Sequence, residues 1–482
     1  MSIVKLINKS IGNPEVVLED DKEILAKILE EERIREENQK SLIDELEPEK
    51  KKILIKKVID NSSKYSFAKT FIENIPLYYD REGLWWGWNQ TRRCWEIIDE
   101  VDILNLVKQV SFQNIIKSNE RTELINALRQ YARENQPEEA KDSWIQFDNE
   151  ILDYRTGERF EADSKYFVKN PIPWKLGKTT DTPTLDRLFK EWVGEKYVDT
   201  LYEELAFLLA RKYFLQRMFV HLGPGANGKG VFQAIQRKFV GDKNCVSTSL
   251  HLLINSRFET AKLRDKLLCT IAETDFNLLN STQLIKSLVS GNDTIPIEYK
   301  NKGHLDYVNY AKVFISTNNL PETSDKTIGF YRRWLIIDFP NQFNENRDVL
   351  SEIPEVEFNN LALKCIEILL KLERTRKFSN EGTYEERQKR YEDRSNPFDK
   401  FLKEMVIEDY NSFTTKNQFK LKLTQWCNEN KFRELSDSTI AKHMKDKGIT
   451  EGRPYMKWFE DGISTEKQVR AWMGIKLIGG EQ

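Results

Sequence analysis

The residues of this chain that are best suited to chemistry lie in a glycine-rich segment, residues 221–232, with the sequence HLGPGANGKGVF. Gly223 is followed by four residues and then by Gly228 and Lys229. This spacing is typical of a loop that cradles phosphates with its backbone N–H groups, while the lysine ammonium reaches the outer phosphates. A structural glycine turn is the alternative interpretation.

The segments on both sides of the loop favour the first interpretation. Residues 217–222 predict a buried strand, and residues 231–240 predict a helix that ends at Gly241. A strand, a glycine loop and a helix in this order place a helix N-terminus beside the phosphates. The sequence therefore predicts an ATP site. The residues expected to contact the nucleotide are Gly223, Gly225, Asn227, Gly228, Lys229, Gly230 and Val231.

A P-loop hydrolyses ATP only with a carboxylate that polarises the attacking water. Residues 266–272 predict a strand that is followed by Glu273, with Asp275 two residues later. We assign Glu273 as the general base and expect Glu273 and Asp275 on the side of a Mg²⁺ ion; a surface acid at the end of a strand is the alternative. Most P-loops carry a metal-binding Ser or Thr where this chain has Gly230, so the metal must find its protein ligands elsewhere.

An amide and two arginines complete the predicted catalytic set. Asn318 follows an apolar strand pattern at residues 312–317, where an amide beside the γ-phosphate orients the attacking water. Arg332 and Arg333 precede the next predicted strand. A guanidinium there, from the same subunit or the next one, stabilises charge on the transferred phosphoryl group. Arg333 is the first choice and Arg332 the second; surface salt bridges are the alternative for both.

Between these motifs lies a segment with the pattern of a β-hairpin. Residues 295–299 and 304–307 predict its two arms, and Lys300, Lys302 and His304 lie at or near its tip. A basic hairpin beside an ATPase core is well placed to grip a phosphate backbone, so these three residues are candidate DNA contacts.

The elements that must position these residues alternate along the middle of the chain. Strand patterns at residues 218–222, 266–272, 311–316 and 334–339 are separated by helical patterns. This alternation predicts an α/β fold with a mainly parallel sheet and helices on both faces.

The segments before this core predict no catalysis. Residues 15–60 are highly charged with helical spacing, which indicates a solvated helical arm or an arm that binds a partner. Residues 84–88 and 94–97 predict a hairpin of aromatic strands around a basic turn, for which an aromatic core is favoured over stacking on single-stranded bases. Helices at 101–118 and 121–135 and a short hairpin at 147–158 are expected next.

The C-terminal part predicts three helices, at residues 398–408, 416–430 and 437–447. Two strands follow, at 455–459 and 471–478, and together they read as the wing of a winged helix. Basic residues lie on or near the third helix and towards the wing: Lys442, His443, Lys445, Lys447, Arg453 and Lys457. Lys442 and Lys445 are the candidate DNA contacts, and packing against protein is the alternative.

Composition excludes several classes of protein. The 482 residues include 75 basic and 77 acidic side chains, so any nucleic-acid surface must be local. The five cysteines are scattered without a C-x-x-C pair, which argues against a zinc site or a disulfide framework and favours a reducing compartment. No apolar run is long enough for a membrane span and no signal peptide is visible, so we expect a protein of the host-cell cytoplasm.

Taken together, the segments GPGANGKG, IAETD, SGND with its hairpin, ISTNNLP and YRRW occur in the order and spacing of superfamily 3 helicases. The chain resembles most closely the phage and plasmid primase-helicase branch related to the poxvirus primase-helicase, in which Asn227 before Gly-Lys is a group mark. The usual N-terminal primase domain is not recognised. The resemblance implies a P-loop AAA+-like core with an α+β domain before it and a winged helix after it. The expected division is 1–64 (charged helical arm), 65–180 (α+β domain), 181–375 (helicase core), 376–396 (linker helix) and 397–482 (winged helix).

The resemblance also implies function and residue roles. It implies an ATP-driven DNA helicase that moves along single-stranded DNA as a homohexameric ring, acts on forked DNA at a viral or plasmid origin, and works with a separate primase or polymerase. Lys229 is then the Walker A lysine, Glu273 the Walker B acid and Asn318 the sensor, while Arg333 completes a neighbour's site and Lys300 or Lys302 grips DNA. An ATP-switched origin-binding initiator or loader is the main alternative, and a non-enzymatic assembly protein is the third.

Overall fold

The structure, a computed structural model, describes most of the chain from Lys64 onward. The described residues are 64–111, 118–148, 150–223, 225–271, 282–298, 304–321, 323–343, 348–430, 432, 434–460 and 463–478. Two compact units are present: the described residues up to Ala140 together with Glu161–Lys169, and Lys141–Phe160 together with Asn170 onward. Nearly all of the expected charged arm, 1–64, lies outside the described residues, and the five-part division of the chain stays a prediction.

The first unit packs three helices against a small antiparallel sheet. Its elements are α4 (Lys64–Asn74), β1 (Leu77–Tyr79), β2 (Trp85–Asn89), β3 (Cys94–Ile98), α5 (Glu100–Ser111), α6 (Ser118–Glu134), β4 (Glu138–Glu139) and β8 (Tyr166–Phe167). The predicted tryptophan hairpin is confirmed as β2 and β3, which pair antiparallel. Its tryptophans are at most 4% exposed, so they form an aromatic core and offer no face for stacking on bases.

The second unit is built on a five-stranded sheet in which every strand pair is parallel. Its strands are β9 (Met218–Leu222), β10 (Cys245–Thr248), β11 (Leu268–Ile271), β14 (Lys312–Thr317) and β15 (Trp334–Asp338), in the order β10-β11-β14-β9-β15. Four of these strands match the predicted set, and the predicted α/β class is confirmed. The strand at the β10 edge was missed, because its residues CVST show neither alternation nor a long apolar run.

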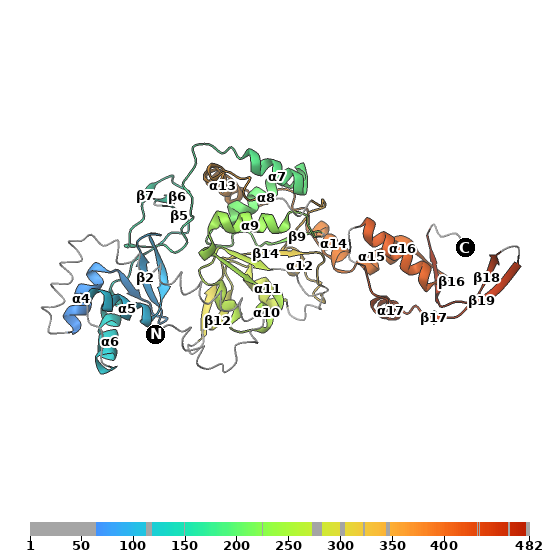
Figure 1. Cartoon of the computed structure of the whole chain (residues 1–482), viewed down its shortest axis with the longest axis horizontal. Coiled ribbons are helices and arrows are strands. Elements are labelled where there is room, and N and C mark those ends of the chain that lie inside the picture. Colours follow the sequence, from blue (N-terminus) through green and yellow to red (C-terminus); the bar gives the residue numbers. More distant parts are fainter. Residues whose placement is uncertain are drawn as a thin grey trace, which may run out of the picture. The chain divides into compact units, whose positions relative to one another are not determined.

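Helices cover both faces of this sheet (Figure 1). In that view α9 (Lys229–Val240) lies above the strands with α7 (Pro183–Val193), α8 (Glu195–Leu208) and α13 (Glu355–Thr375) beyond it, whereas α10 (Leu250–Asn255) and α11 (Gln283–Leu288) lie below. The short helix α12 (Ile328–Tyr331) precedes β15. Before α7, the predicted short hairpin is present as β5 (Trp144–Phe147) and β6 (Glu150–Asp153), followed by β7 (Arg159–Glu161).

The predicted basic hairpin is present as β12 (Thr294–Glu298) and β13 (His304–Val308), which pair antiparallel. Ile295 and Ile297 are buried against the core, and the Thr260 hydroxyl donates a hydrogen bond of 2.8 Å to the Pro296 carbonyl. One face of the hairpin is therefore fixed to the core of the second unit. Lys300 and Lys302 lie outside the described residues, and His304 begins β13.

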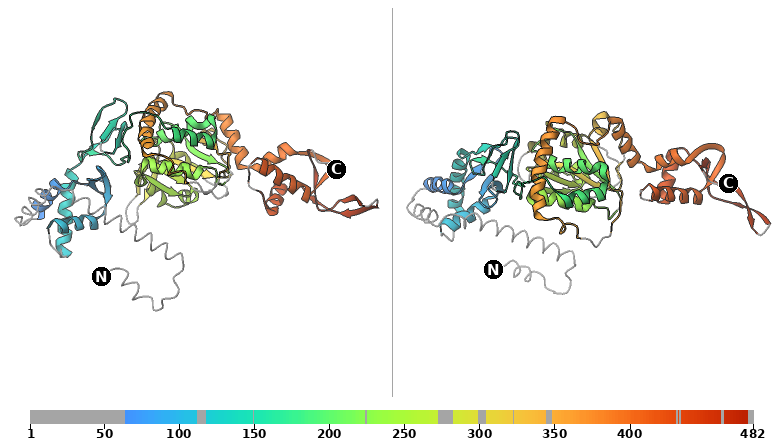
Figure 2. Two further views of the ribbon diagram at one scale, coloured as in Figure 1. Left: turned by 45° about the horizontal axis from the view of Figure 1, so that its top comes forward. Right: turned by 90° about the horizontal axis from the view of Figure 1, so that it is seen from above.

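The C-terminal part follows α14 (Tyr384–Ser395). It contains α15 (Pro397–Met405), β16 (Val406–Thr415), α16 (Lys416–Glu429), α17 (Asp437–Asp446), β17 (Glu451–Gly452), β18 (Tyr455–Glu460), β19 (Ile463–Gln468) and β20 (Ala471–Leu477). The three predicted helices are present, but the pairing of the two predicted strands was wrong. β18 pairs with β19 in a hairpin that projects past the helices, whereas β20 pairs with β16 and β17 (Figure 2). The sequence patterns did not predict the strands β16, β17 and β19.

Two further observations bear on the protein class. Among the described residues, no helix combines the length and the apolar character that a membrane span requires. The five cysteines are buried as free thiols, and burial raises the pKa of Cys245 and Cys269 to about 12. These thiols therefore stay protonated and act as small apolar side chains.

Candidate nucleotide site

The glycine-rich loop connects β9 to α9 as predicted, and two of its glycines are sterically required. Gly228 caps α9 with a φ of +91°, and a Cβ there would lie 2.7 Å from the ring of Trp192. A Cβ on Gly223 would lie 2.3 Å from the Phe339 carbonyl oxygen. At both positions the backbone lies too close to its neighbours for a side chain, so only glycine fits. The absence of a side chain lets the loop turn sharply into the helix.

Lys229 is the first residue of α9 and is only 8% exposed. Its ammonium donates hydrogen bonds to the Gly223 carbonyl and, over 3.1 Å, to the Asn227 side-chain oxygen. The lysine ammonium and the positive end of the α9 helix dipole therefore lie together at the loop. This arrangement suits a phosphate anion.

Asn227 connects the loop to the neighbouring strand. Its side-chain nitrogen donates a hydrogen bond of 3.0 Å to the carbonyl of Phe339, the residue after β15, and its oxygen accepts from Lys229. The side chain is 3% exposed. Asn227, predicted as a nucleotide contact, therefore uses its side chain to hold the loop and the lysine in place.

Two other glycines leave the loop open. A Cβ on Gly225 or Gly230 would meet no atom within 4 Å. At Gly225 this leaves space for phosphate oxygens. At Gly230 it means that a hydroxyl-bearing residue would fit, so nothing in the packing requires glycine there. The next residue, Val231, is half-buried on α9.

The parallel register brings the predicted sensor to the same edge of the sheet. Thr317, the last residue of β14, lies opposite Leu222 of β9, so Asn318 and Gly223 leave the sheet at the same level. Asn318 is half-buried. β11 ends at Ile271 beside β14, and Glu273 and Asp275, which follow it, lie outside the described residues. In the part of the chain that is described, no three His, Cys, Asp or Glu side chains group to hold a metal ion.

A buried pair of titratable side chains, not predicted from the sequence, includes the residue two positions before Gly223. Glu204 of α8 and His221 of β9 are both fully buried, and the Glu204 carboxylate lies 2.9 Å from His221 Nε2. Burial raises the pKa of Glu204, and the nearby imidazole opposes that shift. The sequence does contain a pattern that could have predicted this pair. Glu204 interrupts the apolar run YEELAFLLA, and His221 interrupts the apolar run RMFVHL.

The two predicted arginines lie at the opposite edge of the sheet from the P-loop. β15 runs parallel to β9, with Trp334 beside Met218, so Arg332 and Arg333 precede the strand whereas the P-loop follows β9. A five-residue strand separates these edges by on the order of 15 Å. Neither guanidinium therefore reaches the P-loop of its own chain.

The two arginines differ in exposure. Arg333 is 6% exposed and donates to the Gly329 carbonyl within its own turn, and burial followed by the charge of Arg332 lowers its pKa. Arg332 is exposed, and its guanidinium donates a hydrogen bond of 2.5 Å to the Gln216 side-chain oxygen. Exposure therefore favours Arg332 for a contact with another molecule, which reverses the order expected from sequence.

Helix α14, expected only as a linker, contacts the edge of the sheet at which the glycine-rich loop lies. Asp338, the last residue of β15, accepts hydrogen bonds from Arg390 over 2.6 Å and from Arg394 over 3.0 Å. The Tyr391 hydroxyl donates over 2.8 Å to the Pro321 carbonyl, in the loop that begins with Asn318. The helix thus fixes both the β15 end and the sensor loop.

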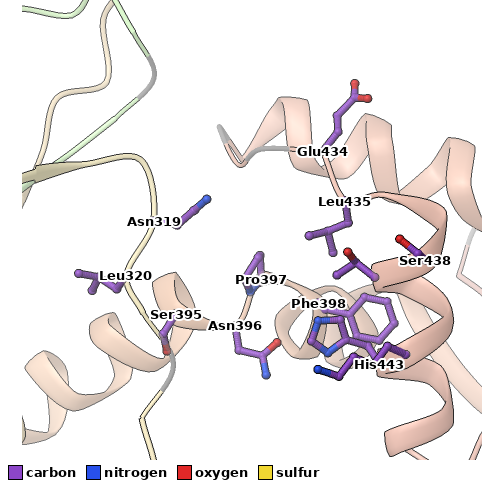
Figure 3. A pocket seen from close by; sticks show the side chains of 12 residues that line it. Asn319, Leu320, Ser395, Asn396, Pro397, Phe398, Glu434, Leu435, Ser438 and His443 are labelled. Atoms are coloured by element: carbon purple, nitrogen blue, oxygen red, sulfur yellow. The ribbon is translucent and has the colours of Figure 1, made fainter. Parts of the chain in front are cut away.

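A cavity of about 480 Å³ lies between that loop and the C-terminal helices (Figure 3). Asn319 and Leu320 line one side, and residues of α15 and α17 line the other. Lys442, a predicted DNA contact, and His443, whose ring stacks on Phe398, are among the lining residues. Of the other candidate contacts, Lys445 is exposed on α17, and Lys447 is paired with Asp399 at 2.8 Å.

Comparison with known proteins identifies two segments of the chain. Residues 65–198 match a family described as D5 N terminal like, and residues 221–333 match a family of unknown function, DUF5906. These matches confirm the resemblance to the phage and poxvirus-related primase-helicases that the motifs indicated.

Solved structures similar to this chain include two of the NrS-1 C terminal region. The apo structure has a TM-score of 0.47 at 13% identity, and the A form apo structure has a TM-score of 0.44 at 13% identity. In both cases the match covers 86% of this chain and 100% of the other.

Proposed function

We propose that this protein is an ATP-dependent replicative DNA helicase of a virus, phage or plasmid-like element, working as a homohexameric ring on single-stranded and forked DNA. The observation that carries the proposal is the division of the ATPase machinery between two edges of one sheet. Lys229 and Asn318 lie at one edge and the exposed Arg332 at the other. A site divided in this way is complete only when the arginine edge of one subunit meets the P-loop edge of the next.

In the proposed reaction, Lys229 and the N-terminus of α9 bind the β- and γ-phosphates, and Asn318 orients the attacking water. Glu273, which follows β11, is proposed as the general base. Mg²⁺, when bound with ATP, neutralises phosphate charge. Because Gly230 supplies no hydroxyl, Glu273 and Asp275 are proposed to lie on the side of the metal.

Arg332 is proposed as the residue that stabilises the transferred phosphoryl group in the neighbouring subunit. Arg332 is exposed, and the Gln216 side-chain amide to which it donates is neutral, so this contact does not compensate its positive charge. Arg333 instead supports the turn that presents it. The hairpin β12–β13, anchored to the same core, is proposed to follow the DNA backbone through Lys300, Lys302 and His304.

The experiment that tests the proposal measures ATP hydrolysis with and without single-stranded DNA, and unwinding of a forked duplex. We expect DNA to stimulate hydrolysis and the wild type to unwind the fork. Lys229→Ala should abolish both activities while leaving the circular dichroism spectrum unchanged. Hydrolysis that ignores DNA, with no unwinding, would reject the helicase and leave an ATP-driven switch.

The C-terminal part favours a second candidate, an ATP-switched origin-binding initiator or loader. The order α15, β16, α16, α17, β17, β20, with β20 between β16 and β17 in the sheet, supports a winged helix in which α17 is the recognition helix. Exposed Lys442 and Lys445 on α17 suit phosphate contacts.

Duplex binding tests the second candidate. Removal of residues 397–482 should then abolish sequence-selective binding to duplex DNA and leave slow ATP hydrolysis. Unchanged duplex binding by the shortened protein would reject it. In either case the expected setting is the cytoplasm of the host cell, with a separate primase or polymerase as a partner.

A further inference from the structure

Gln216, which precedes β9, connects the exposed arginine to the root of the hairpin. Its side-chain oxygen accepts the hydrogen bond of 2.5 Å from Arg332, and its side-chain nitrogen donates one of 2.9 Å to the Ser290 carbonyl. Ser290 lies between α11 and β12. One planar amide therefore joins the two regions proposed to meet ATP and DNA.

The hairpin root on the far side of this amide is tightly packed. Ser290 is 5% exposed, and its hydroxyl accepts hydrogen bonds from the backbone N–H groups of Asn292, over 3.2 Å, and Asp293, over 2.7 Å. Gly291 has a φ of +81°, and a Cβ there would lie 2.1 Å from the Tyr213 carbonyl oxygen. Movement of the Ser290 carbonyl is therefore passed to the first residues of β12 rather than absorbed by a loose loop.

The return side of the hairpin is fixed to the same segment. The Asn309 side chain, 1% exposed, donates to the Leu288 carbonyl over 2.8 Å and to the Ala311 carbonyl over 3.0 Å. The Tyr213 hydroxyl donates to that same Ala311 carbonyl over 2.9 Å. Both strands of the hairpin are thus held by the chain just before β9.

Charge acts between the same elements. Burial and the charge of Arg332 lower the pKa of Arg333, and Asp293, at the start of the hairpin, opposes that lowering. The arginine turn and the hairpin root therefore attract each other, and Gln216 provides the directional contact between them.

We propose that Gln216 is a positioning residue that couples the subunit-interface ATP site to the DNA hairpin. When Arg332 binds a phosphate in the neighbouring subunit, its hydrogen bond to the Gln216 side-chain oxygen must break or change direction. The Gln216 amide then moves, and its hydrogen bond to the Ser290 carbonyl transmits that movement to the hairpin root. This inference rests on the proposed function. By thermodynamic reciprocity, DNA on the hairpin must also change the engagement of Arg332.

Two substitutions separate the two ends of the contact. Gln216→Glu keeps an acceptor for Arg332 but replaces the donor to the Ser290 carbonyl with a repelling oxygen. Gln216→Met has a similar length and removes both hydrogen bonds. Gln130→Glu, at an exposed position of α6, is the charge-matched control.

The readouts are ratios taken on the full-length protein. The first is hydrolysis with single-stranded DNA divided by hydrolysis without it, and the second is the DNA dissociation constant without nucleotide divided by that with a non-hydrolysable ATP analogue. We expect both ratios to fall by about fivefold or more in both Gln216 variants, the size of a typical coupling between sites. We expect Gln130→Glu to match the wild type.

The outcomes are distinguishable. A purely structural role would lower the melting temperature and leave both ratios unchanged, and that result would overturn the coupling. Ratios equal to the control in Gln216→Glu, with a fall only in Gln216→Met, would overturn the part assigned to Ser290. If the wild type itself showed no DNA-stimulated hydrolysis, the proposed function would fail before the variants were compared, and the coupling would fail with it.

Discussion

Glycine has two different roles within the P-loop, and they are separated by what surrounds each Cα. At Gly228 a positive φ and the nearby Trp192 ring exclude any side chain, whereas at Gly230 the space around Cβ is open. The first position is dictated by the fold. At the second position the fold does not require glycine, and its presence removes the hydroxyl with which most P-loops hold Mg²⁺.

We therefore predict opposite effects from two substitutions in the loop. Gly230→Ser should fold normally and gain about 0.5 kcal/mol, because glycine is a poor helix former, and should lower the Mg²⁺ concentration needed for half-maximal hydrolysis. Gly228→Ala should lose nucleotide binding and melt earlier. Thermal melts and Mg²⁺ titrations of ATP hydrolysis measure both effects. An unchanged Mg²⁺ requirement in Gly230→Ser would mean that the added hydroxyl does not reach the metal.

The buried pair of Glu204 and His221 gives a stability prediction at the same scale. His221→Ala removes the hydrogen-bond partner of a fully buried carboxyl group, which typically costs about 1–3 kcal/mol, whereas Glu204→Gln keeps a neutral acceptor and should cost less. Urea unfolding of both single variants and the double variant would give the coupling energy. Additive losses would show that the two side chains contribute independently.

At the scale of elements, the sequence predicted what local pattern controls. The strands β9, β11, β14 and β15 were found because each is a short apolar run that ends in a polar motif. β10 and β16 were missed because their residues are polar or irregular and become strands only by pairing with neighbours. Gln216 and Asp338 were missed for a related reason, since their partners are 74 and 52 to 56 residues away in sequence.

The pairing of the C-terminal strands shows the same limit. Residues 455–459 and 471–478 were correctly expected to be strands, but Asp461 and Gly462 between β18 and β19 form the kind of dipeptide that closes a hairpin. This local preference favours pairing of β18 with β19 over pairing of residues 455–459 with residues 471–478, which lie further along the chain. Register depends on turn chemistry as well as on which segments are strands.

The segment before α12 gives an element-scale prediction with a defined pH dependence. Burial alone would raise the pKa of Asp325, but hydrogen bonds from Lys286, Thr282 and Thr327 lower it below its ordinary value of 3.8. Because the folded-state pKa is the lower one, this stabilisation is complete above about pH 4 and is lost as the pH falls through the folded-state pKa.

Asp325→Asn should therefore cost on the order of 2 kcal/mol near neutral pH, since it removes charge-assisted hydrogen bonds that join α11 to the segment before α12. The difference from the wild type should shrink near pH 3. Chemical denaturation at the two pH values measures it. A difference that stays constant would show that the loss comes from packing rather than from the charge.

At the scale of the whole molecule, the separation of Lys229 and Arg332 is the feature with the largest consequence. Each chain carries the two parts at opposite edges of the β9–β15 sheet. A heterologous contact, in which one face of a subunit meets a different face of the next, repeats until the ring closes. In the proposed ring, each active site would take its P-loop from one subunit and its arginine from another.

Mixing two inactive variants tests this directly. Lys229→Ala retains Arg332, and Arg332→Ala retains the P-loop. An active interface needs an Arg332→Ala subunit on its P-loop side and a Lys229→Ala subunit on its arginine side. A random equal mixture should therefore restore about one quarter of the sites. ATP hydrolysis of the mixture, after dissociation and reassembly, is the measurement. Arg333→Ala is the matched control, because a buried arginine bonded to its own turn should lose stability rather than complement. If the mixture stays inactive while Lys229→Ala with Arg333→Ala recovers hydrolysis, the interface arginine is Arg333, and the exposed Arg332 serves another purpose.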